Sequence, residues 1–225
     1  MKERMINIGQ DTIDGAPRRS LFGRLAGAAA FGLAGLLPKT SSAQTAAPAS
    51  DGPHWPGKLN GRHRQVVDGY QANAGSPLLY ACTFLLTNES PGAAKAVVVL
   101  RAGALPIALN SAIWEKYKIG ESLKIIDPET KAPAVKNPFL HPKSGVLQTD
   151  EMAVDWLLAK GAIFGACKMA LHGLSKKLAS NAGVSVDDAV KEWTANVVPG
   201  IIIIPSGTWG VNRAQEAGCT YCSGG

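Results

Sequence analysis

Cys167 is the residue best placed for chemistry, because a short apolar run ends on it and a helical pattern begins directly after it. Residues 162–166 have the length and composition of a buried strand, and apolar residues then recur at helical spacing to about Ser180. A helix N-terminus offers unpaired N–H groups and about half a positive charge. Both favour the thiolate form of a cysteine, which is the nucleophile in thiol chemistry. The sequence therefore predicts a strand-end cysteine that accepts sulfur or exchanges thiols, with Lys168 as a candidate stabiliser of the thiolate. A buried, inert cysteine is the alternative interpretation.

A second pair of thiols, Cys219 and Cys222, lies near the end of the chain in the sequence Cys-Thr-Tyr-Cys. This spacing is found in redox dithiols and in half of a zinc site. In redox enzymes it opens a helix, whereas here it falls where we expect an edge strand. Three interpretations are open: a structural disulfide, a pair that resolves sulfur on Cys167, and a metal site completed by Cys167 or His172.

Two further residues have simpler interpretations. His172 follows Cys167 by five positions, which is about 140° around an ideal helix, so we do not pair the two as base and nucleophile. Cys82 lies among apolar residues of a predicted helix over residues 77–88 and is expected to be a buried small hydrophobe.

The first 43 residues have the order of an export signal. Arg18 and Arg19 precede an apolar run over residues 25–37, and small residues follow at 41–43. The run is shorter than the 20 or so residues of a membrane span, so the pattern predicts a twin-arginine (Tat) signal peptide cleaved near Ala43 and a periplasmic mature chain.

Removing residues 1–43 takes away six of the 23 basic and three of the 17 acidic side chains, which leaves a net charge of +3. The mature chain has no basic stripe interleaved with aromatic residues, so we expect no nucleic-acid partner. We also predict no membrane span after the signal. The sequence has no P-loop or dinucleotide fingerprint, and we expect no cofactor.

After the signal we expect a Pro/Gly-rich linker or arm over residues 44–62 and one domain over residues 63–225. Strand patterns alternate with helix patterns, which predicts an α/β layered fold with a mostly parallel sheet of about five strands and helices on both faces. The predicted strands cover residues 64–70, 96–100, 162–166 and 201–204, with the Cys219–Cys222 region as an edge strand. The β-branched runs at 96–100 and 201–204 are typical of strands buried on both faces.

A proline-rich segment and an arginine at a strand end are further candidates for a functional role. Residues 119–149 contain four prolines and little periodicity, which indicates a functional lid or an oligomer contact, and a helix is predicted over 151–160. Arg101 ends a predicted strand, where α/β sheets bind ligands, and it either faces an anion or is an ordinary surface charge.

The C-terminal part of the chain resembles the DsrE/DsrF-like family. The resemblance is carried by Val-Pro-Gly-Ile-Ile-Ile-Ile-Pro-Ser-Gly at residues 198–207 and by Gln-Glu-Ala-Gly-Cys-Thr-Tyr at residues 215–221. It covers roughly residues 64–222, including the strand that ends in Cys167. It implies a flavodoxin-like fold, an oligomer, and in several members a relay of persulfide sulfur through the cysteine at the position of Cys167.

These observations give one leading hypothesis and two alternatives. The leading one is an exported sulfur-relay or thiol-exchange protein, a sulfurtransferase-type carrier, with Cys219 and Cys222 as resolving pair. Its expected partners are a second copy of the chain, a sulfur donor or acceptor protein or small inorganic sulfur compound, and the Tat translocase during export. The alternatives are a non-catalytic oligomeric binding module with a C-terminal disulfide, and a metal-binding protein that uses the Cys-x-x-Cys pair.

Overall fold

The computed structural model describes residues 55–88, 90 and 92–225. The chain divides into two units, Met1–Ala46 and Ala47–Gly225, and all described residues belong to the second. The predicted signal peptide, with Arg18, Arg19 and the cleavage site after Ala43, lies outside the described residues.

The centre of the described unit is a sheet of five parallel strands in the order β4-β3-β2-β1-β5. The strands are β1 (His63–Gly69), β2 (Ala94–Leu100), β3 (Ile163–Cys167), β4 (Ile202–Ile204) and β5 (Thr220–Ser223). Each connection between successive strands contains a helix, as parallel neighbours require. The predicted α/β layered sheet of about five strands is confirmed.

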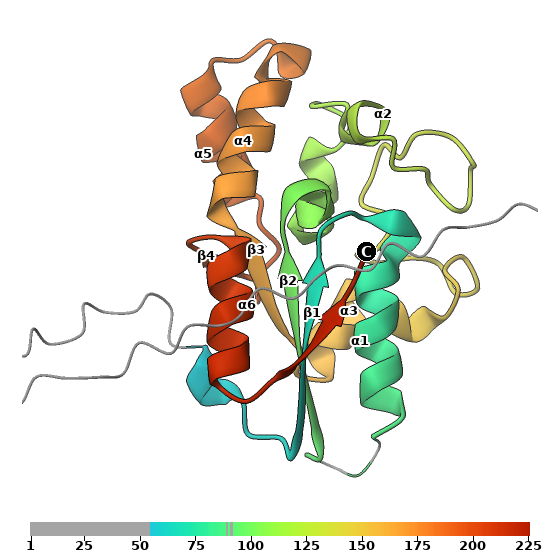
Figure 1. Ribbon diagram of the computed structural model, residues 1–225. Helices are drawn as coiled ribbons and strands as arrows, with labels where there is room; N and C mark the ends of the chain where they lie inside the picture. Colours follow the sequence, from blue (N-terminus) through green and yellow to red (C-terminus); the bar gives the residue numbers. More distant parts are fainter. Residues whose placement is uncertain (1–54, 89, 91) are drawn as a thin grey trace, which may run out of the picture. The chain divides into compact units, whose positions relative to one another are not determined.

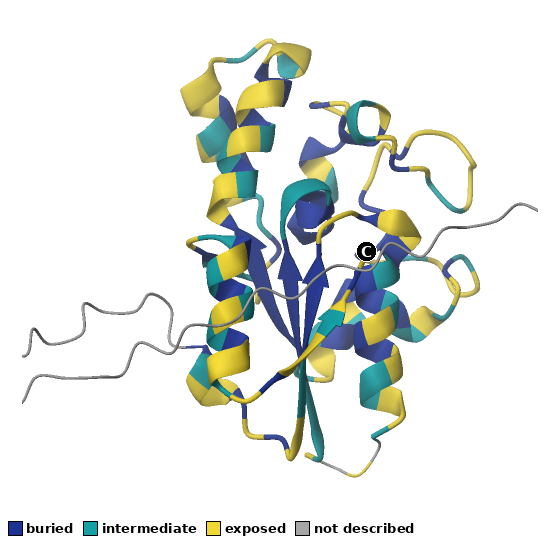
Figure 2. Ribbon diagram, in the orientation of Figure 1, coloured by how far each residue is buried: buried dark blue, intermediate teal, exposed yellow. Residues whose placement is uncertain are grey.

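Helices cover both faces of this sheet (Figure 1). They are α1 (Ser76–Leu86), α2 (Ile119–Leu123), α3 (Val154–Ala159), α4 (Lys168–Leu178), α5 (Val186–Ala195) and α6 (Gly207–Glu216). Helix α1 packs on one face against β1 and β2, and α6 packs on the opposite face. Each face has its own apolar cluster, and the central strands between them are buried (Figure 2). No helix in the described part of the chain has the length and apolar character needed to cross a bilayer.

Two predicted elements differ from the structure. The isoleucine run of β4 was expected to be buried on both faces, but β4 is an edge strand and Ile202 and Ile203 are half-buried. The helix expected over 151–160 is broken by extended backbone at Ala153, so a 3₁₀ turn, Asp150–Met152, precedes a shorter α3. Gly161, with a φ of +79°, ends this segment as the sequence predicts.

The described end of the predicted arm is part of the fold. Trp55 is buried and makes an edge-on contact with Trp209 of α6, with the ring centroids 6.3 Å apart. Leu59 is buried in the same apolar cluster. Residues 55–62 therefore extend the α6 layer instead of forming a free linker.

The proline-rich segment 119–149 is also attached to the core. Phe139, Leu140 and Leu147 are buried in the cluster on the α1 face. The buried amide of Asn137 bonds to the 3₁₀ turn Ala102–Ala108 that follows β2 and to Leu109 just after it. The segment is thus held against the core and the turn that follows β2, and its predicted role as a lid or an oligomer contact stays a prediction.

Helices α4 and α5 form a hairpin that extends beyond the carboxyl end of β3 (Figure 1). Trp193 of α5 is fully buried and meets Tyr117 edge-on, with centroids 5.5 Å apart. The Glu192 carboxylate accepts hydrogen bonds from Lys116 Nζ at 2.6 Å and Tyr117 Oη at 2.7 Å. These contacts hold the hairpin against the segment after β2.

Glu192→Gln is expected to lower the free energy of unfolding by about 1 kcal/mol at pH 7. The hydrogen bond and charge of Lys116 lower the pKa of Glu192. A carboxyl group with a lowered folded pKa stabilises the fold above its ordinary pKa, about 4.3, and loses this contribution as the pH falls through the folded value. Urea unfolding should therefore show a larger difference between variant and parent at pH 7 than at pH 3. An equal difference at both pH values would contradict this assignment.

Candidate active site

Cys167 lies where the sequence predicts it, as the last residue of β3 and the N-cap of α4. Its Sγ accepts a hydrogen bond from the backbone N–H of Ala170 at 3.3 Å. This bond occupies one of the unpaired amides at the start of an 11-residue helix. The thiol is therefore held in the field of the helix N-terminus, although its residue is only 5% exposed.

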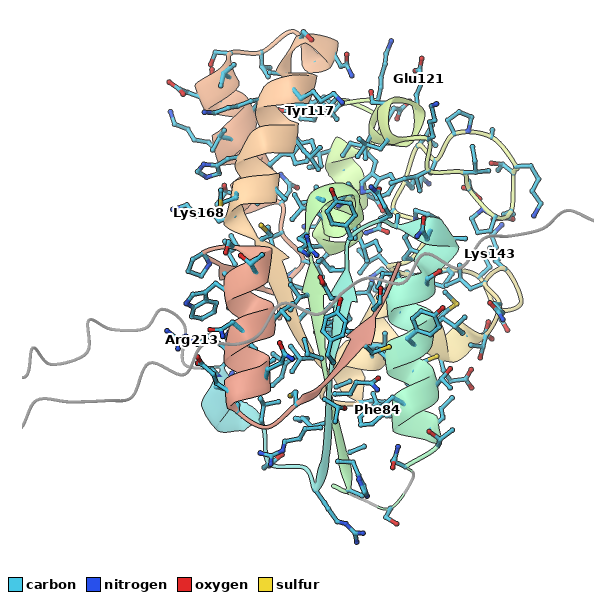
Figure 3. The ribbon with its side chains drawn as sticks, viewed as in Figure 1. Phe84, Tyr117, Glu121, Lys143, Lys168 and Arg213 are labelled. Carbon is cyan, nitrogen blue, oxygen red and sulfur yellow. The ribbon has the colours of Figure 1, made fainter. Side chains whose placement is uncertain are left out.

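Lys168 is exposed at the first position of α4 (Figure 3). Met169, the next residue, is 71% exposed, so the surface beside the buried thiol combines a positive charge with an apolar side chain. His172 is half-buried one turn further along α4. No hydrogen bond joins it to Cys167 in the described structure, in agreement with the angular argument from the sequence.

The other three cysteines are in different environments. Cys82 is fully buried in the cluster on the α1 face, as predicted, and its Sγ donates to the carbonyl of Leu79. Burial raises the pKa of Cys82, Cys219 and Cys222, which disfavours their thiolates. Cys167 differs from them in its position, because its Sγ caps the N-terminus of a helix and accepts the backbone N–H of Ala170 there.

The expected pairing of Cys219 with Cys222 needs correction. Both are free thiols. Cys219 belongs to the cluster on the α6 face, whereas Cys222 packs against the cluster on the α1 face. Residues three apart along an extended strand have Cα atoms about 10 Å apart, beyond the roughly 7 Å that a disulfide spans. The sheet itself thus separates the two sulfurs, and they form neither a local disulfide nor a chelating pair.

The Cys219–Cys222 segment is also remote from Cys167 within one chain. β5 pairs with β1, and two strand spacings separate β1 from β3. Three spacings of about 4.8 Å place β5 roughly 14 Å from β3. Within the described residues no group of three His, Cys, Asp or Glu side chains could hold a metal ion. The predicted roles of Cys219 and Cys222 as resolving pair or metal ligands therefore have no geometric basis in the single chain.

A second group of polar side chains lies at the same edge, and the sequence did not identify most of it. Arg101 follows β2, and its Nε and Nη2 atoms donate to Asp68 at 2.6 and 2.8 Å. Tyr70 stacks on the guanidinium at 4.7 Å, and Tyr221 Oη donates to Asp68 at 3.2 Å. We call Asp68, Tyr70, Arg101 and Tyr221 the carboxyl-edge cluster.

The cluster fixes the charge states of its members. The hydrogen bond from Arg101 to Asp68 raises the pKa of Arg101. Burial, followed by the charge of Asp68, raises the pKa of Tyr221, so its hydroxyl stays a donor at neutral pH. Arg101 is therefore neither the free anion site nor the plain surface charge that the sequence left open, because it is the partner of a buried carboxylate.

The cluster and Cys167 share one edge and one face of the sheet. Arg101 and Cys167 directly follow the paired residues Leu100 and Ala166 of adjacent strands. The stem of Arg101 lies against Gly207, the first residue of α6, where any Cβ would overlap it. Arg101 therefore contacts β1 through Asp68 and the start of α6 through Gly207. It lies beside β3, the strand that carries Cys167.

Neither a scan against protein-family models nor a search of curated proteins finds a match to this chain.

Proposed function

We propose that this chain is an exported sulfur-relay protein, similar to the DsrE/DsrF-like family, that carries sulfur as a persulfide on Cys167. The observation that supports this most directly is the hydrogen bond from Ala170 N–H to the Cys167 sulfur at the start of α4. This donor is placed to hydrogen-bond the sulfur that accepts the transferred atom. The shared C-terminal sequence pattern supports the family assignment.

The transfer is a thiolate exchange in which atoms and electrons balance. The Cys167 thiolate attacks the sulfane sulfur of a donor persulfide, R–S–S⁻, forming Cys167–S–S⁻ and releasing R–S⁻. In the second step an acceptor thiolate attacks the outer sulfur, and Cys167 leaves as a thiolate. Neither step needs an external oxidant or reductant, because sulfane sulfur moves from one thiolate to another.

The surroundings of Cys167 favour an anionic sulfur donor. Lys168 is exposed at the first turn of α4, where the helix N-terminus adds partial positive charge. A small inorganic donor such as thiosulfate would lose its sulfane sulfur to Cys167 and leave as sulfite. A donor or acceptor protein would present its thiolate over the exposed Met169.

The compartment and the assembly are part of the proposal. Arg18 and Arg19, the apolar run and the small residues before Gln44 support export through the Tat translocase to the periplasm. A homo-oligomer is proposed from the family resemblance.

Incubation of the reduced protein with thiosulfate or polysulfide, followed by intact-mass spectrometry, tests the proposal. The expected product is an adduct of about 32 Da that dithiothreitol removes. Cys167→Ser should abolish it. Cys222→Ser is the matched control, because that thiol is half-buried but does not cap a helix, and it should load like the parent. An adduct that persists in Cys167→Ser, or its absence in the parent, would overturn the proposal.

The burial of Cys167 favours a second candidate, a non-catalytic binding module. In that case the thiol is a structural N-cap and the carboxyl edge serves binding alone. Iodoacetamide labelling of the native protein separates the two: rapid modification of Cys167 supports sulfur relay, and labelling only after unfolding supports the binding module.

A further inference from the structure

A pocket of about 310 Å³ lies at the carboxyl ends of β1 and β2, apart from Cys167. Its walls are the loop 71–74 after β1, Gly103 after β2, and residues 123–126 of the proline-rich segment. Open α/β sheets bind ligands at this edge, and the volume is at the lower end of the range for small-molecule sites. The proline-rich segment thus supplies one wall of this pocket, through residues 123–126.

The pocket wall concentrates unfavourable backbone conformations. Asn73, Ala74 and Lys124 line it with positive φ angles of 37°, 53° and 56°. Ala102, with a φ of 44°, adjoins the lining residue Gly103. L-residues avoid this region because Cβ approaches the backbone. Such conformations persist where the surrounding structure enforces them, and they gather at ligand sites.

The pocket also depends on a close contact between its two strand-end loops. The side-chain oxygen of Gln71 lies so near Gly103 that any Cβ at position 103 would overlap it. Gly103 therefore allows Gln71 to lie against the wall instead of filling the space. The loop after β1 and the loop after β2 therefore pack closely against each other at the pocket wall.

The lining chemistry selects an anion with an apolar part. Lys124 carries an ammonium group, and Gln71 and Asn73 carry amides, among the residues that line the pocket. The apolar lining comes from Leu123, Ile125 and Ile126. None of the lining residues is acidic.

The acidic side chains near the pocket are directed elsewhere, and the C-terminal residue, Gly225, lies beside Asn73. In the described residues no carboxylate pairs with Lys124. Asp127, the next acidic residue along the chain, accepts hydrogen bonds from the N–H groups of Glu129 and Thr130. The Lys124 ammonium is thus available to an external anion.

We propose that this pocket binds a small organic carboxylate with a short aliphatic chain. Lys124 and the amides of Gln71 and Asn73 hold the carboxylate, and Leu123 and Ile126 cover the chain. The proposal does not rest on sulfur relay, because the pocket shares no lining residue with the surroundings of Cys167.

Titration of the ¹⁵N-labelled full chain with hexanoate, hexylammonium and hexan-1-ol tests the site at constant ionic strength. Hexanoate is expected to cause saturable chemical-shift changes in residues 71–74, 103 and 123–126. Its Kd should be at least about tenfold lower than that of either other probe, since a charge-assisted hydrogen bond distinguishes them.

Lys131 provides a matched control for Lys124. Both lysines are exposed residues of the proline-rich segment with a left-handed φ, 60° at Lys131, but Lys131 does not line the pocket. Replacing either by Gly removes one charge and relieves the same backbone conformation, so both variants should unfold at a slightly higher temperature than the parent. Lys124→Gly should weaken hexanoate binding about tenfold or more, whereas Lys131→Gly should change it less than about twofold.

Three results would overturn the proposal. They are absence of saturable hexanoate shifts in the parent, binding of hexylammonium as tight as that of hexanoate, and an equal loss of affinity in Lys124→Gly and Lys131→Gly. A persulfide adduct on Cys167 would be unaffected by any of them, so the two proposals fail separately.

Discussion

Asp68→Asn is expected to lower the free energy of unfolding by about 3 kcal/mol at neutral pH. Asp68 is buried, and its two carboxylate oxygens accept from Nε and Nη2 of Arg101. The neutral amide presents only one acceptor oxygen and leaves the guanidinium without its counter-charge. The loss should fall at the lower end of the range for buried pairs, because the Arg101 side chain keeps 28% exposure. Urea unfolding followed by far-UV circular dichroism measures it.

An exposed ion pair of the same length provides the control. Lys143 Nζ lies 2.6 Å from Glu129, with side-chain exposures of 75% and 46%. Glu129→Gln should cost far less than Asp68→Asn, because water screens the exposed pair. Arg101→Met and the double variant with Asp68→Asn complete a thermodynamic cycle, with an expected coupling of about 2 kcal/mol. Two results would contradict the importance of burial. One is a double variant whose loss of unfolding free energy equals the sum of the Asp68→Asn and Arg101→Met losses. The other is an equal loss in Asp68→Asn and Glu129→Gln.

The features of the site that could be predicted from the sequence are those set by residues adjacent in the chain. Cys167 is an N-cap because a strand pattern ends and a helix pattern starts at that residue, and both patterns can be read locally. The burial of Cys82 follows equally from the helical spacing of its apolar neighbours. These predictions needed no knowledge of strand order.

The carboxyl-edge cluster could not be predicted because it depends on which strands are adjacent. Asp68 and Arg101 are 33 positions apart, and Tyr221 joins them only because β5 returns to pair with β1. The edge position of β4 depends on the same unknown order. A run of isoleucines is compatible with a central strand and with an edge strand that a helix covers on one face.

The error at Cys219 and Cys222 had a signal in the sequence. Once the segment is assigned to a strand, side chains alternate between the two faces, so positions three apart point in opposite directions. The Cys-x-x-Cys spacing brings sulfurs together in a helix or a tight turn. The prediction combined a strand assignment with a geometry that a strand does not allow.

The second large effect is expected at Asn137, which attaches the proline-rich segment to the core. Its Nδ2 donates to the carbonyls of Ile107 and Leu109 at 2.9 and 2.8 Å, and its Oδ1 accepts from Phe139 N–H at 3.0 Å. The residue is 5% exposed, so water does not replace these bonds when the side chain is removed. Asn137→Ala should therefore lower the free energy of unfolding by about 3 kcal/mol, because three backbone groups lose their partner.

Hydrogen exchange shows whether this loss is local to the segment. In Asn137→Ala, amides of residues 119–149 should exchange faster than those of β1–β3, because the segment loses its anchor while the sheet keeps its own packing. Asn181→Ala is the matched control: that amide donates to Tyr117 O and Ser122 Oγ at 3.0 Å but is exposed, so its removal should cost about 1 kcal/mol. Equal costs at Asn137 and Asn181, or uniform acceleration of exchange across the sheet, would contradict the role of Asn137 as an anchor.

The same variant also bears on the pocket proposed to bind a carboxylate. Residues 123–126 form one wall of that pocket, so loosening the segment should also weaken hexanoate binding.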